Sequence, residues 1–310
     1  MKALRPMDIT RWKLPDDAFW DSDDRGSDAM AREPVGDFSG LLIDLPTRVR
    51  IQQRATLPAG IYHHGTIREL AAVTLPKLAA LVAVNRDGTQ IHVAHGQGLC
   101  PDDDELPSAP IDVSTLPEGD MSTTYGVDLR ALFGLPWRPG RYRVRVLLRD
   151  VVSNPADVAL VDGTEDAAER QAGSASGLAP QWSPSTLTLA CPRIVNLLRG
   201  DNWSISGTVG LRLPAAGPDS MQAAGTVAPD PVPRPQAVHL LLTGADDGSV
   251  HTLTVMAGLQ QTAPGQVEGR FEVDLTDRAR SLPLQTYFVT AFAGDLATQP
   301  APSGLLAFGP

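Results

Sequence analysis

Apolar and polar residues alternate along much of the chain, as they do in β-strands. The apolar run Leu81–Val84 is followed by an Asp-Gly turn and then by Ile91–Val93. The same order returns at Val238–Leu242, a second Asp-Gly pair and Val250–Val255. Alternation with a period of two indicates strands, and Asp-Gly favours a tight hairpin turn because its residues tolerate positive φ. The pattern predicts two similar β-hairpins.

A longer internal repeat links the two halves of the sequence. Tyr125-Gly-Val-Asp-Leu129 is echoed by Phe271-Glu-Val-Asp-Leu275, and Tyr142 by Tyr287 at almost the same spacing. The register then continues without a gap as far as Leu160 and Leu305. A repeat of this length is a whole domain rather than a solenoid unit. We therefore expect an all-β chain of two tandem antiparallel β-sandwich domains.

The end of each repeat resembles fibronectin type III and immunoglobulin-like domains. The segments that carry the likeness are Leu135-Pro-Trp-Arg-Pro-Gly-Arg-Tyr142 and, less completely, Leu282-Pro-Leu-Gln-Thr-Tyr287. In those families a Leu-Pro corner precedes a tyrosine that opens the penultimate strand and ties back to the backbone. The resemblance implies that Tyr142 and Tyr287 hold that position. It covers about a tenth of the chain, and it implies an architecture and no function.

Changes in composition set the expected domain limits. An acidic arm is expected over residues 1–37, a first β-sandwich over 38–161 and a linker rich in Gly, Ala and Ser over 162–180. The second β-sandwich is expected over 181–310, with a Pro/Gly-rich loop at 214–235.

Composition narrows the class of protein further. A chain of 310 residues fits two domains, and its 28 Gly and 27 Pro favour many turns over long helices. One segment, residues 67–73, is compatible with either a short helix or a strand. A formal net charge of −10 repels phosphate backbones and anionic lipid surfaces, so we expect no nucleic acid partner and no membrane partner.

The N-terminus shows no apolar core of a secretory signal, and no apolar run approaches the roughly 20 residues of a membrane helix. If the numbering begins at the true initiator, a cytoplasmic location is expected. The cysteines, Cys100 and Cys191, are far apart and in different predicted domains, which predicts two inert thiols rather than a disulfide.

Motifs for chemistry are weak. The histidines do not have metal-ligand spacing, because neighbours on a strand point to opposite faces. They are His63, His64, His92, His95, His239 and His251. The weak metal candidate is the run Asp102, Asp103, Asp104 and Glu105, whose oxygens suit Ca²⁺ although the spacing of an EF-hand loop is missing. No Gly-x-Ser-x-Gly and no phosphate-binding loop is found, so no catalytic residue and no cofactor are predicted.

Aromatic residues give the remaining functional lead. Trp12, Phe19 and Trp20 stand among six aspartates in the arm. An acidic segment with few aliphatics cannot bury enough surface to fold alone, whereas tryptophan is a frequent interface anchor. We expect these three residues to bind a protein partner or to dock on the protein's own domains. Of the other tryptophans, Trp203 is expected in the core and Trp137 against its own corner.

We interpret the chain as a non-catalytic interaction or assembly subunit that binds a partner protein through its sandwich surfaces and its aromatic arm. Two alternatives stay open. One is a carbohydrate-binding accessory protein, because β-sandwiches commonly offer tryptophan platforms to sugars. The other is an enzyme whose site lies in the interdomain cleft and leaves no linear motif.

Overall fold

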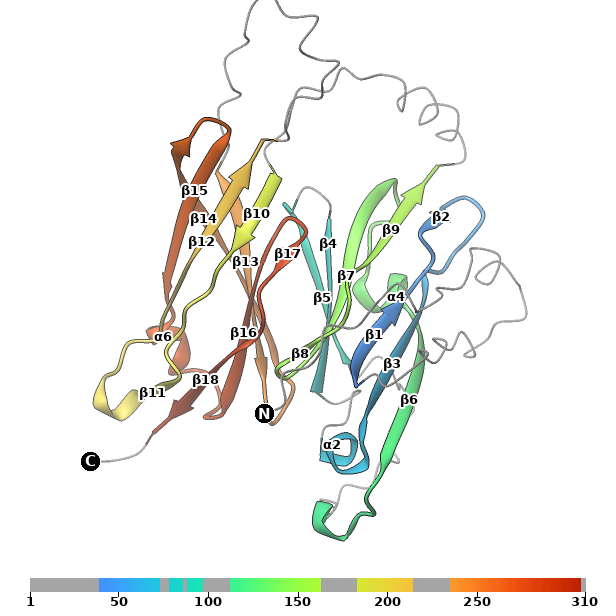
Figure 1. The fold of residues 1–310 in the computed structure, drawn as a ribbon, viewed down its shortest axis with the longest axis horizontal. Helices are drawn as coiled ribbons and strands as arrows, with labels where there is room; N and C mark the ends of the chain where they lie inside the picture. Colours follow the sequence, from blue (N-terminus) through green and yellow to red (C-terminus); the bar gives the residue numbers. More distant parts are fainter. Residues whose placement is uncertain are drawn as a thin grey trace, which may run out of the picture. The chain divides into compact units, whose positions relative to one another are not determined.

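The computed structural model describes residues 39–72, 78–85, 88–96, 112–162, 183–213 and 235–307. The prediction of an all-β chain is confirmed: strands dominate these residues, and their longest helix, α2 (Ile67–Ala72), has six residues. No helix among them is long and apolar enough to cross a membrane. The chain divides into two compact units, which we call unit 1 (β1 to β9) and unit 2 (β10 to β18) (Figure 1).

Unit 1 is a sandwich of two sheets. The first has the strand order β1-β3-β6, and the second has the order β2-β9-β7-β4-β5, with β8 paired to β7. Neighbouring strands are antiparallel except for β2 and β9, which are parallel. The strands are β1 (Gly40–Asp44), β2 (Arg48–Arg50), β3 (Pro58–Thr66), β4 (Ala79–Asn85), β5 (Ile91–His95), β6 (Asp120–Asp128), β7 (Gly140–Leu148), β8 (Val151–Val152) and β9 (Ala156–Val161).

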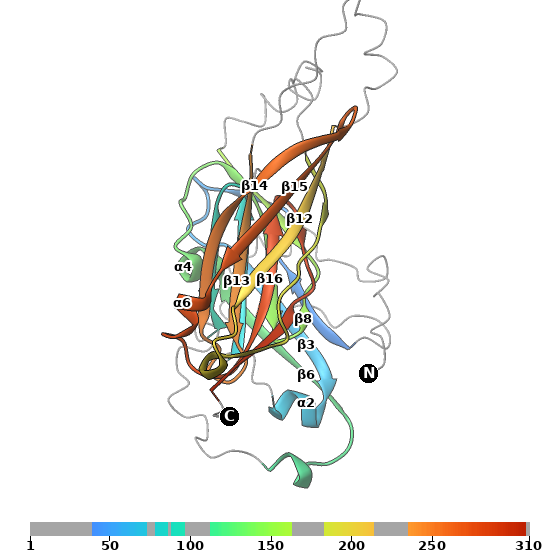
Figure 2. The ribbon, with the colours of Figure 1, turned by 90° about the vertical axis from the view of Figure 1, so that its left-hand side faces the viewer.

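Unit 2 has the continuous strand order β10-β12-β15-β14-β13-β16-β18-β11, with β17 paired to β16 (Figures 1 and 2). The order is continuous because β14, which has 14 residues, neighbours both β13 and β15. The strands are β10 (Ser183–Leu187), β11 (Ile194–Asn196), β12 (Ser204–Arg212), β13 (Gln236–Gly244), β14 (Val250–Ala263), β15 (Gln266–Asp274), β16 (Thr286–Ala293), β17 (Leu296–Ala297) and β18 (Ala301–Leu306). Short 3-10 turns lie at η4 (Val113–Thr115) and η5 (Leu197–Arg199).

Each unit encloses a hydrophobic core of its own. In unit 1, Ile43 and Ile61 of the first sheet belong to one cluster with Leu81 of the second. In unit 2, the cluster joins Trp203, which precedes β12, to Tyr287 of β16. Removing this apolar surface from water, at about 25 cal/mol per Å² of buried area, is the main force that stabilises each core.

The two units repeat the same pairings at equivalent residues. Tyr142 of β7 pairs with Val158 of β9, and Tyr287 of β16 pairs with Ser303 of β18, the same number of residues further on. The parallel pair β2/β9 likewise corresponds to β11/β18. Tyr287 Oη donates to Pro283 O at 3.2 Å, the bond back to the backbone that the corner signature implies. The two tyrosines thus occupy equivalent places, whereas the predicted domain limits stay predictions.

The predicted hairpins are present in both units. Strand β4 pairs with β5 antiparallel, and β13 neighbours β14. Gly88 and Gly248 of the two Asp-Gly turns have φ values of 68° and 64°. Glycine adopts such values readily because it has no Cβ. The predicted linker 162–180 and loop 214–235 lie almost entirely outside the described residues.

Helix α2 resolves the ambiguity of residues 67–73. Thr66 N donates to Glu69 Oε2 at 3.0 Å, and Glu69 N donates to Thr66 Oγ1 at 3.2 Å. This reciprocal pair is a capping box, which satisfies two N–H groups at the start of a helix. Hydrogen bonds from the backbone and the side chain of Thr66 to the carboxylate lower the pKa of Glu69, so this group stays charged there.

A carboxylate closes the end of β6 in unit 1. Asp128 Oδ1 accepts from Leu57 N at 2.8 Å and from Arg130 N at 3.0 Å, and it caps helix α4 (Leu129–Phe133). Leu129 N donates to Leu57 O at 2.8 Å. One side chain therefore fixes both the helix start and the segment that leads into β3.

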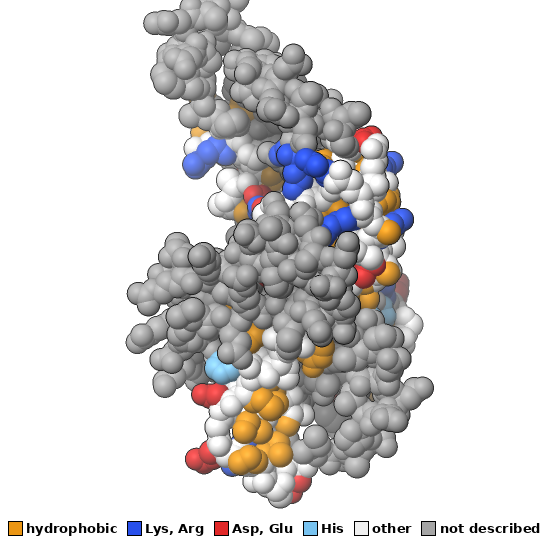
Figure 3. All heavy atoms as spheres, turned by 90° about the vertical axis from the view of Figure 1, so that its right-hand side faces the viewer, with side chains coloured by type: hydrophobic (Ala, Val, Ile, Leu, Met, Phe, Trp, Pro, Cys, Tyr) orange, Lys and Arg blue, Asp and Glu red, His pale blue; other side chains and the backbone are white. Residues whose placement is uncertain are grey.

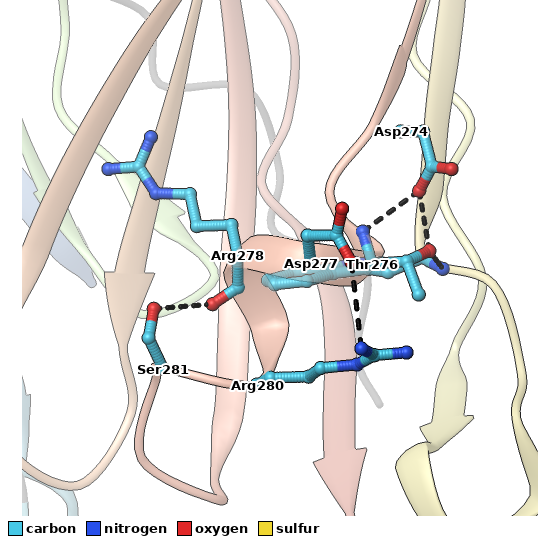
Figure 4. A network of polar contacts seen from close by, with 7 residues as sticks. Asp274, Thr276, Asp277, Arg278, Arg280 and Ser281 are labelled. Carbon is cyan, nitrogen blue, oxygen red and sulfur yellow. Dashed lines mark hydrogen bonds and ion pairs between the residues drawn. The ribbon is translucent and has the colours of Figure 1, made fainter.

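In unit 2 an aspartate holds the equivalent segments together, with a threonine hydroxyl between the carboxylate and the backbone N–H (Figure 4). Asp274 accepts from both the N–H and the hydroxyl of Thr276, and Thr276 Oγ1 accepts in turn from Trp203 N at 2.9 Å. These bonds lower the pKa of Asp274. Helix α6 (Thr276–Ala279) follows, with an exposed Asp277–Arg280 pair at 3.8 Å that contributes little stability.

Candidate binding surfaces

Several predicted site residues lie outside the described residues. These are Trp12, Phe19 and Trp20 of the arm, the acidic run Asp102, Asp103, Asp104 and Glu105, and also Cys100 and Trp182. Their predicted roles in partner and metal binding stay predictions. Among the described residues, no group of three or more His, Cys, Asp or Glu side chains could hold a metal ion.

Both described tryptophans are packed, as expected. Trp203 is fully buried, with its ring centroid 5.8 Å from that of Tyr287. Trp137 Nε1 donates to Ile51 O at 3.0 Å, and the Arg130 guanidinium lies 4.4 Å from the centre of its ring. Neither ring is left open as a stacking platform for a sugar.

Two histidines contact the corner tyrosines, a relation the sequence analysis did not find. His92 of β5 lies against Tyr142, with ring centroids 6.0 Å apart, and His251 of β14 lies against Tyr287 at 6.2 Å. The signal was available, because each histidine is the second residue of the strand that follows an Asp-Gly turn. Burial lowers the pKa of His92, which favours the neutral ring and a packing role.

Cys191 behaves as the expected inert thiol. It is half-buried and is not part of a disulfide, and its Sγ lies 3.9 Å from Ala301 O. Burial raises the pKa of this thiol. Because the thiolate is the reactive form, the raised pKa opposes a nucleophilic role.

A row of arginines covers the outer face of the second sheet of unit 1. Val49 of β2 and Val144 and Val146 of β7 point into the core, so the alternate residues of these strands point away from it. The residues at these alternate positions are arginines throughout β2 and, in β7, as far as residue 145. We call the following residues the arginine face, although Arg145 among them is buried: Arg48, Arg50, Arg141, Arg143 and Arg145.

The arginine face is continuous across three strands. Ala159 of β9 pairs with Arg48 on one side and with Arg141 on the other, which puts the two arginines two strand spacings apart, about 10 Å. Arg143 makes two bonds of 2.6 Å to the carboxylate of Asp157. Figure 3 shows Lys and Arg side chains gathered toward the end of the unit where Figure 1 places β2 and β9. The face thus holds at least one arginine–carboxylate pair.

The equivalent end of unit 2 carries aliphatic side chains instead. Ile194, Leu198 and Leu284 are 63%, 64% and 55% exposed, and we call them the aliphatic patch. Ile194 pairs with Gly304, which also pairs with Thr286, and Leu305 N donates to Gln285 O at 2.9 Å. These pairings bring β11, η5 and the corner before β16 within about two strand spacings of one another.

Side chains occupy the backbone edges of two outer strands. Asn154 clamps β1: its amide donates to Ile43 O at 2.9 Å and its oxygen accepts from Ile43 N at 2.8 Å. At β11, Asp201 Oδ2 accepts from Asn196 N at 2.8 Å. A strand added from another protein at either of these two edges would have to displace these bonds.

The sequence held uneven signals for the two surfaces. Arginine at every second position of 141–145 and at 48 and 50 is a readable one-face pattern. The aliphatic patch has no linear pattern, because the parallel pairing of the three-residue strand β11 assembles it.

Comparisons with known proteins add little to this geometry. No family model matches the chain, and no curated protein is similar to it. Among solved structures, the selenomethionine-substituted chicken interferon gamma receptor alpha chain matches at 9% sequence identity, over 86% of this chain and 97% of that chain, with a TM-score of 0.17. A TM-score this low supports no statement about fold or function.

Proposed function

We propose that the protein is a non-catalytic interaction or assembly subunit, and that the aliphatic patch of unit 2 binds a partner protein. The observation that carries the proposal is the exposure of Ile194, Leu198 and Leu284 on elements that the pairing with β18 brings together. Exposed apolar residues that gather in one area mark interaction sites, whereas scattered ones do not. The partner surface is expected to be apolar where it meets these three side chains, although the exposed Arg193 and Arg199 flank Ile194 and Leu198 in the sequence.

The patch is suited to a moderate interaction. Burying each of its three side chains contributes about 1.5 to 3 kcal/mol before the costs of association are subtracted. The side-chain bonds at β1 and β11 argue against strand addition at these two edges, and at the aliphatic patch binding is expected to use side chains. Trp12, Phe19 and Trp20 of the arm are proposed as a second set of anchors.

A charge introduced into the patch tests this function. Ile194→Glu/Leu198→Glu should abolish binding of the partner that the wild-type chain retains from its native host, because two carboxylates would be desolvated at the interface. Binding is then measured by titration with the purified partner, where at least a tenfold loss of affinity is expected.

The matched control is Met256→Glu, on β14, because this side chain is 58% exposed and outside the patch. It should leave the affinity unchanged. Retention of the same partner at the same affinity by the patch variant would overturn the proposal. Sedimentation of the chain alone, over a range of concentrations, shows whether the partner is a second copy.

A further inference from the structure

We infer that the outer edge of β6 in unit 1 pairs with the same edge of a second copy of this chain. The inference is independent of the aliphatic patch. Its basis is a difference between two equivalent strands. Strand β6 pairs with β3 and with no other described strand, whereas β15 pairs with β12 on one side and with β14 on the other (Figure 1).

The strands β6 and β15 hold equivalent places in the two units. Asp128 of β6 pairs with Pro58 of β3. Asp274 of β15 pairs with Ser204 of β12, each residue the same number of positions further on. Both strands have nine residues, and the register with the inner neighbour is uninterrupted in both. The two strands therefore differ only in what lies at the outer edge.

The inward side of β6 is more exposed than that of β15. Val267 and Phe271 of β15 belong to the core of unit 2 and are 3% and 4% exposed. Tyr125, at the place of Phe271, packs against the core of unit 1 but is only half-buried. Met121, at the place of Val267, lies on the same side of the strand as Tyr125 and is 41% exposed. A further strand beside β6 would cover this methionine.

The backbone of β6 offers hydrogen bonds at the same edge. Leu129 N donates to Leu57 O, which shows that the odd-numbered residues of β6 turn their peptide groups toward β3. Ser122, Thr124 and Gly126 therefore turn theirs away from it. Among the described residues, no backbone or side-chain group bonds to these outward N–H and C=O groups. The strand also has no proline and no bulge, two devices that protect edges elsewhere.

The sequence after β5 is unsuited to fill this edge in the way that β14 does in unit 2. Counted from the equivalent histidines His92 and His251, the position of Gln260 in β14 is taken by Pro101. Proline has no N–H to donate to a neighbouring strand, and aspartate, which occupies the next three positions, is depleted in strands. The expected neighbour is therefore a strand of another molecule.

Strand β6 is complementary to itself. In an antiparallel pair with a two-fold axis at Thr123, Met121 of one copy lies opposite Tyr125 of the other. This contact occurs twice, and a thioether against an aromatic ring is favourable. Ser122 then lies opposite Thr124, so that two residues with outward peptide groups meet and can exchange hydrogen bonds.

Charge favours this register over its neighbour. With the axis at Thr123, Asp120 lies opposite Gly126, whereas an axis at Thr124 would place Asp120 opposite Asp128 and oppose two like charges. A stable interface usually buries about 1,600 Å² in total, and two paired strand edges bury less than that. We therefore expect a weak dimer that forms in the micromolar range of protein concentration.

Sedimentation of the full chain over a range of concentrations tests the inference. The wild-type chain should show a dimer whose fraction rises with concentration. Met121→Glu should weaken this dimer about tenfold or more, because it places a carboxylate against the tyrosine ring of the other copy. The matched control is Met256→Glu on β14, where an exposed methionine outside β6 is changed in the same way and the dimer should be unaffected.

A second variant removes a backbone donor at the edge. Thr124→Pro deletes an N–H group that points away from β3, so it should weaken the dimer while the pairing of β6 with β3 is kept. Circular dichroism and the unfolding midpoint show whether this variant and Met121→Glu fold, and either one is sufficient for the test.

Disulfide formation tests the register. In a chain with Cys100→Ser and Cys191→Ser, Thr123→Cys should form a disulfide-linked dimer under mild oxidation. Residues on the two-fold axis are a non-hydrogen-bonded pair with Cα atoms about 4.5 Å apart, within the range of a disulfide. Ser122→Cys in the same background should link far less, because each Ser122 lies opposite Thr124.

Four outcomes overturn the inference. They are a chain that stays monomeric at all concentrations, a dimer that neither Met121→Glu nor Thr124→Pro weakens, and stronger linkage through Ser122→Cys than through Thr123→Cys. The fourth is slow hydrogen exchange at the amides of Ser122 and Thr124 in the dilute monomer, which would show that the chain's own residues fill the edge. Ile194→Glu/Leu198→Glu should leave the dimer intact, so failure here is distinguishable from failure of the aliphatic patch; a dimer lost in that variant alone belongs to the patch.

Discussion

Units 1 and 2 share one backbone plan but present different chemistry at matching positions. Where β2 carries Arg48, the equivalent strand β11 carries Ile194, and where β7 carries Arg141, β16 carries Thr286. The registers of these strands are the same in both units. The comparison teaches that the inward residues and the corner fix the sandwich, whereas the outward residues are free to specialise, one unit for charge and the other for apolar contact.

The largest expected effect comes from the buried residue that precedes β3 in unit 1 and β12 in unit 2. Trp203 and Leu57 make equivalent backbone bonds and are both fully buried. Trp203→Ala should lower the free energy of unfolding by about 3 to 5 kcal/mol, and Leu57→Ala by about 2 to 5 kcal/mol. Denaturant unfolding measures the loss, and hydrogen exchange shows which unit opens. A loss below about 1 kcal/mol for Trp203→Ala would contradict a packed core there.

Removing the polar contacts at the start of α4 and of α6 should lower the free energy of unfolding by smaller amounts, which differ between the two units. Asp128→Ala removes the acceptor of two N–H groups, so a loss of about 1 to 2 kcal/mol is expected. Thr276→Val removes the hydroxyl that accepts from Trp203 N, and about 1 kcal/mol is expected. The comparison would be broken if Thr276→Val cost more than Asp128→Ala in denaturant unfolding. The exposed Asp277→Ala is the control and should change the unfolding free energy little.

The smallest effect is a dependence of stability on pH. Burial lowers the pKa of His63 in unit 1 and of His239 in unit 2, although Glu69 partly offsets the change at His63. These histidines therefore bind protons more readily in the unfolded chain than in the folded one. Their contribution to stability is present above the unfolded pKa of about 6.5 and is lost as the pH falls below it. The unfolding midpoint should drop between pH 7.5 and 5.5. His63→Gln should lessen that drop, and an equal drop in this variant would assign the dependence elsewhere.

The sequence predicted the fold better than the surfaces. The all-β class, the hairpins with their Asp-Gly turns and the equivalence of Tyr142 and Tyr287 depend on local spacing, which one sequence displays directly. The arginine face was readable in principle, because strand alternation alone assembles it. The aliphatic patch was not, since Ile194 and Leu284 are distant in sequence and only the pairing of β11 and β16 with β18 brings them together.

The helix at 67–73 illustrates a different limit. Periodicity could not separate helix from strand over so few residues, because the positions of Ile67 and Leu70 are compatible with either element. The structure decides through Thr66 and Glu69, two polar side chains that bond each other's backbone. Short elements are specified by their ends, where polar contacts outweigh the apolar pattern.

The two hydrogen bonds between Asn154 and Ile43 protect the edge of β1 against aggregation. A carboxamide carries one donor group and one acceptor, so it mimics a peptide unit and saturates the middle of β1 without offering a further edge. A strand treated in this way cannot template another strand, which is the first step of fibril growth and of exchange between copies. In unit 2 the equivalent position is Gln299, which is exposed. The protection of β1 is therefore a property of unit 1, whereas unit 2 has a different side-chain bond at an outer strand, from Asn196 N of β11 to Asp201.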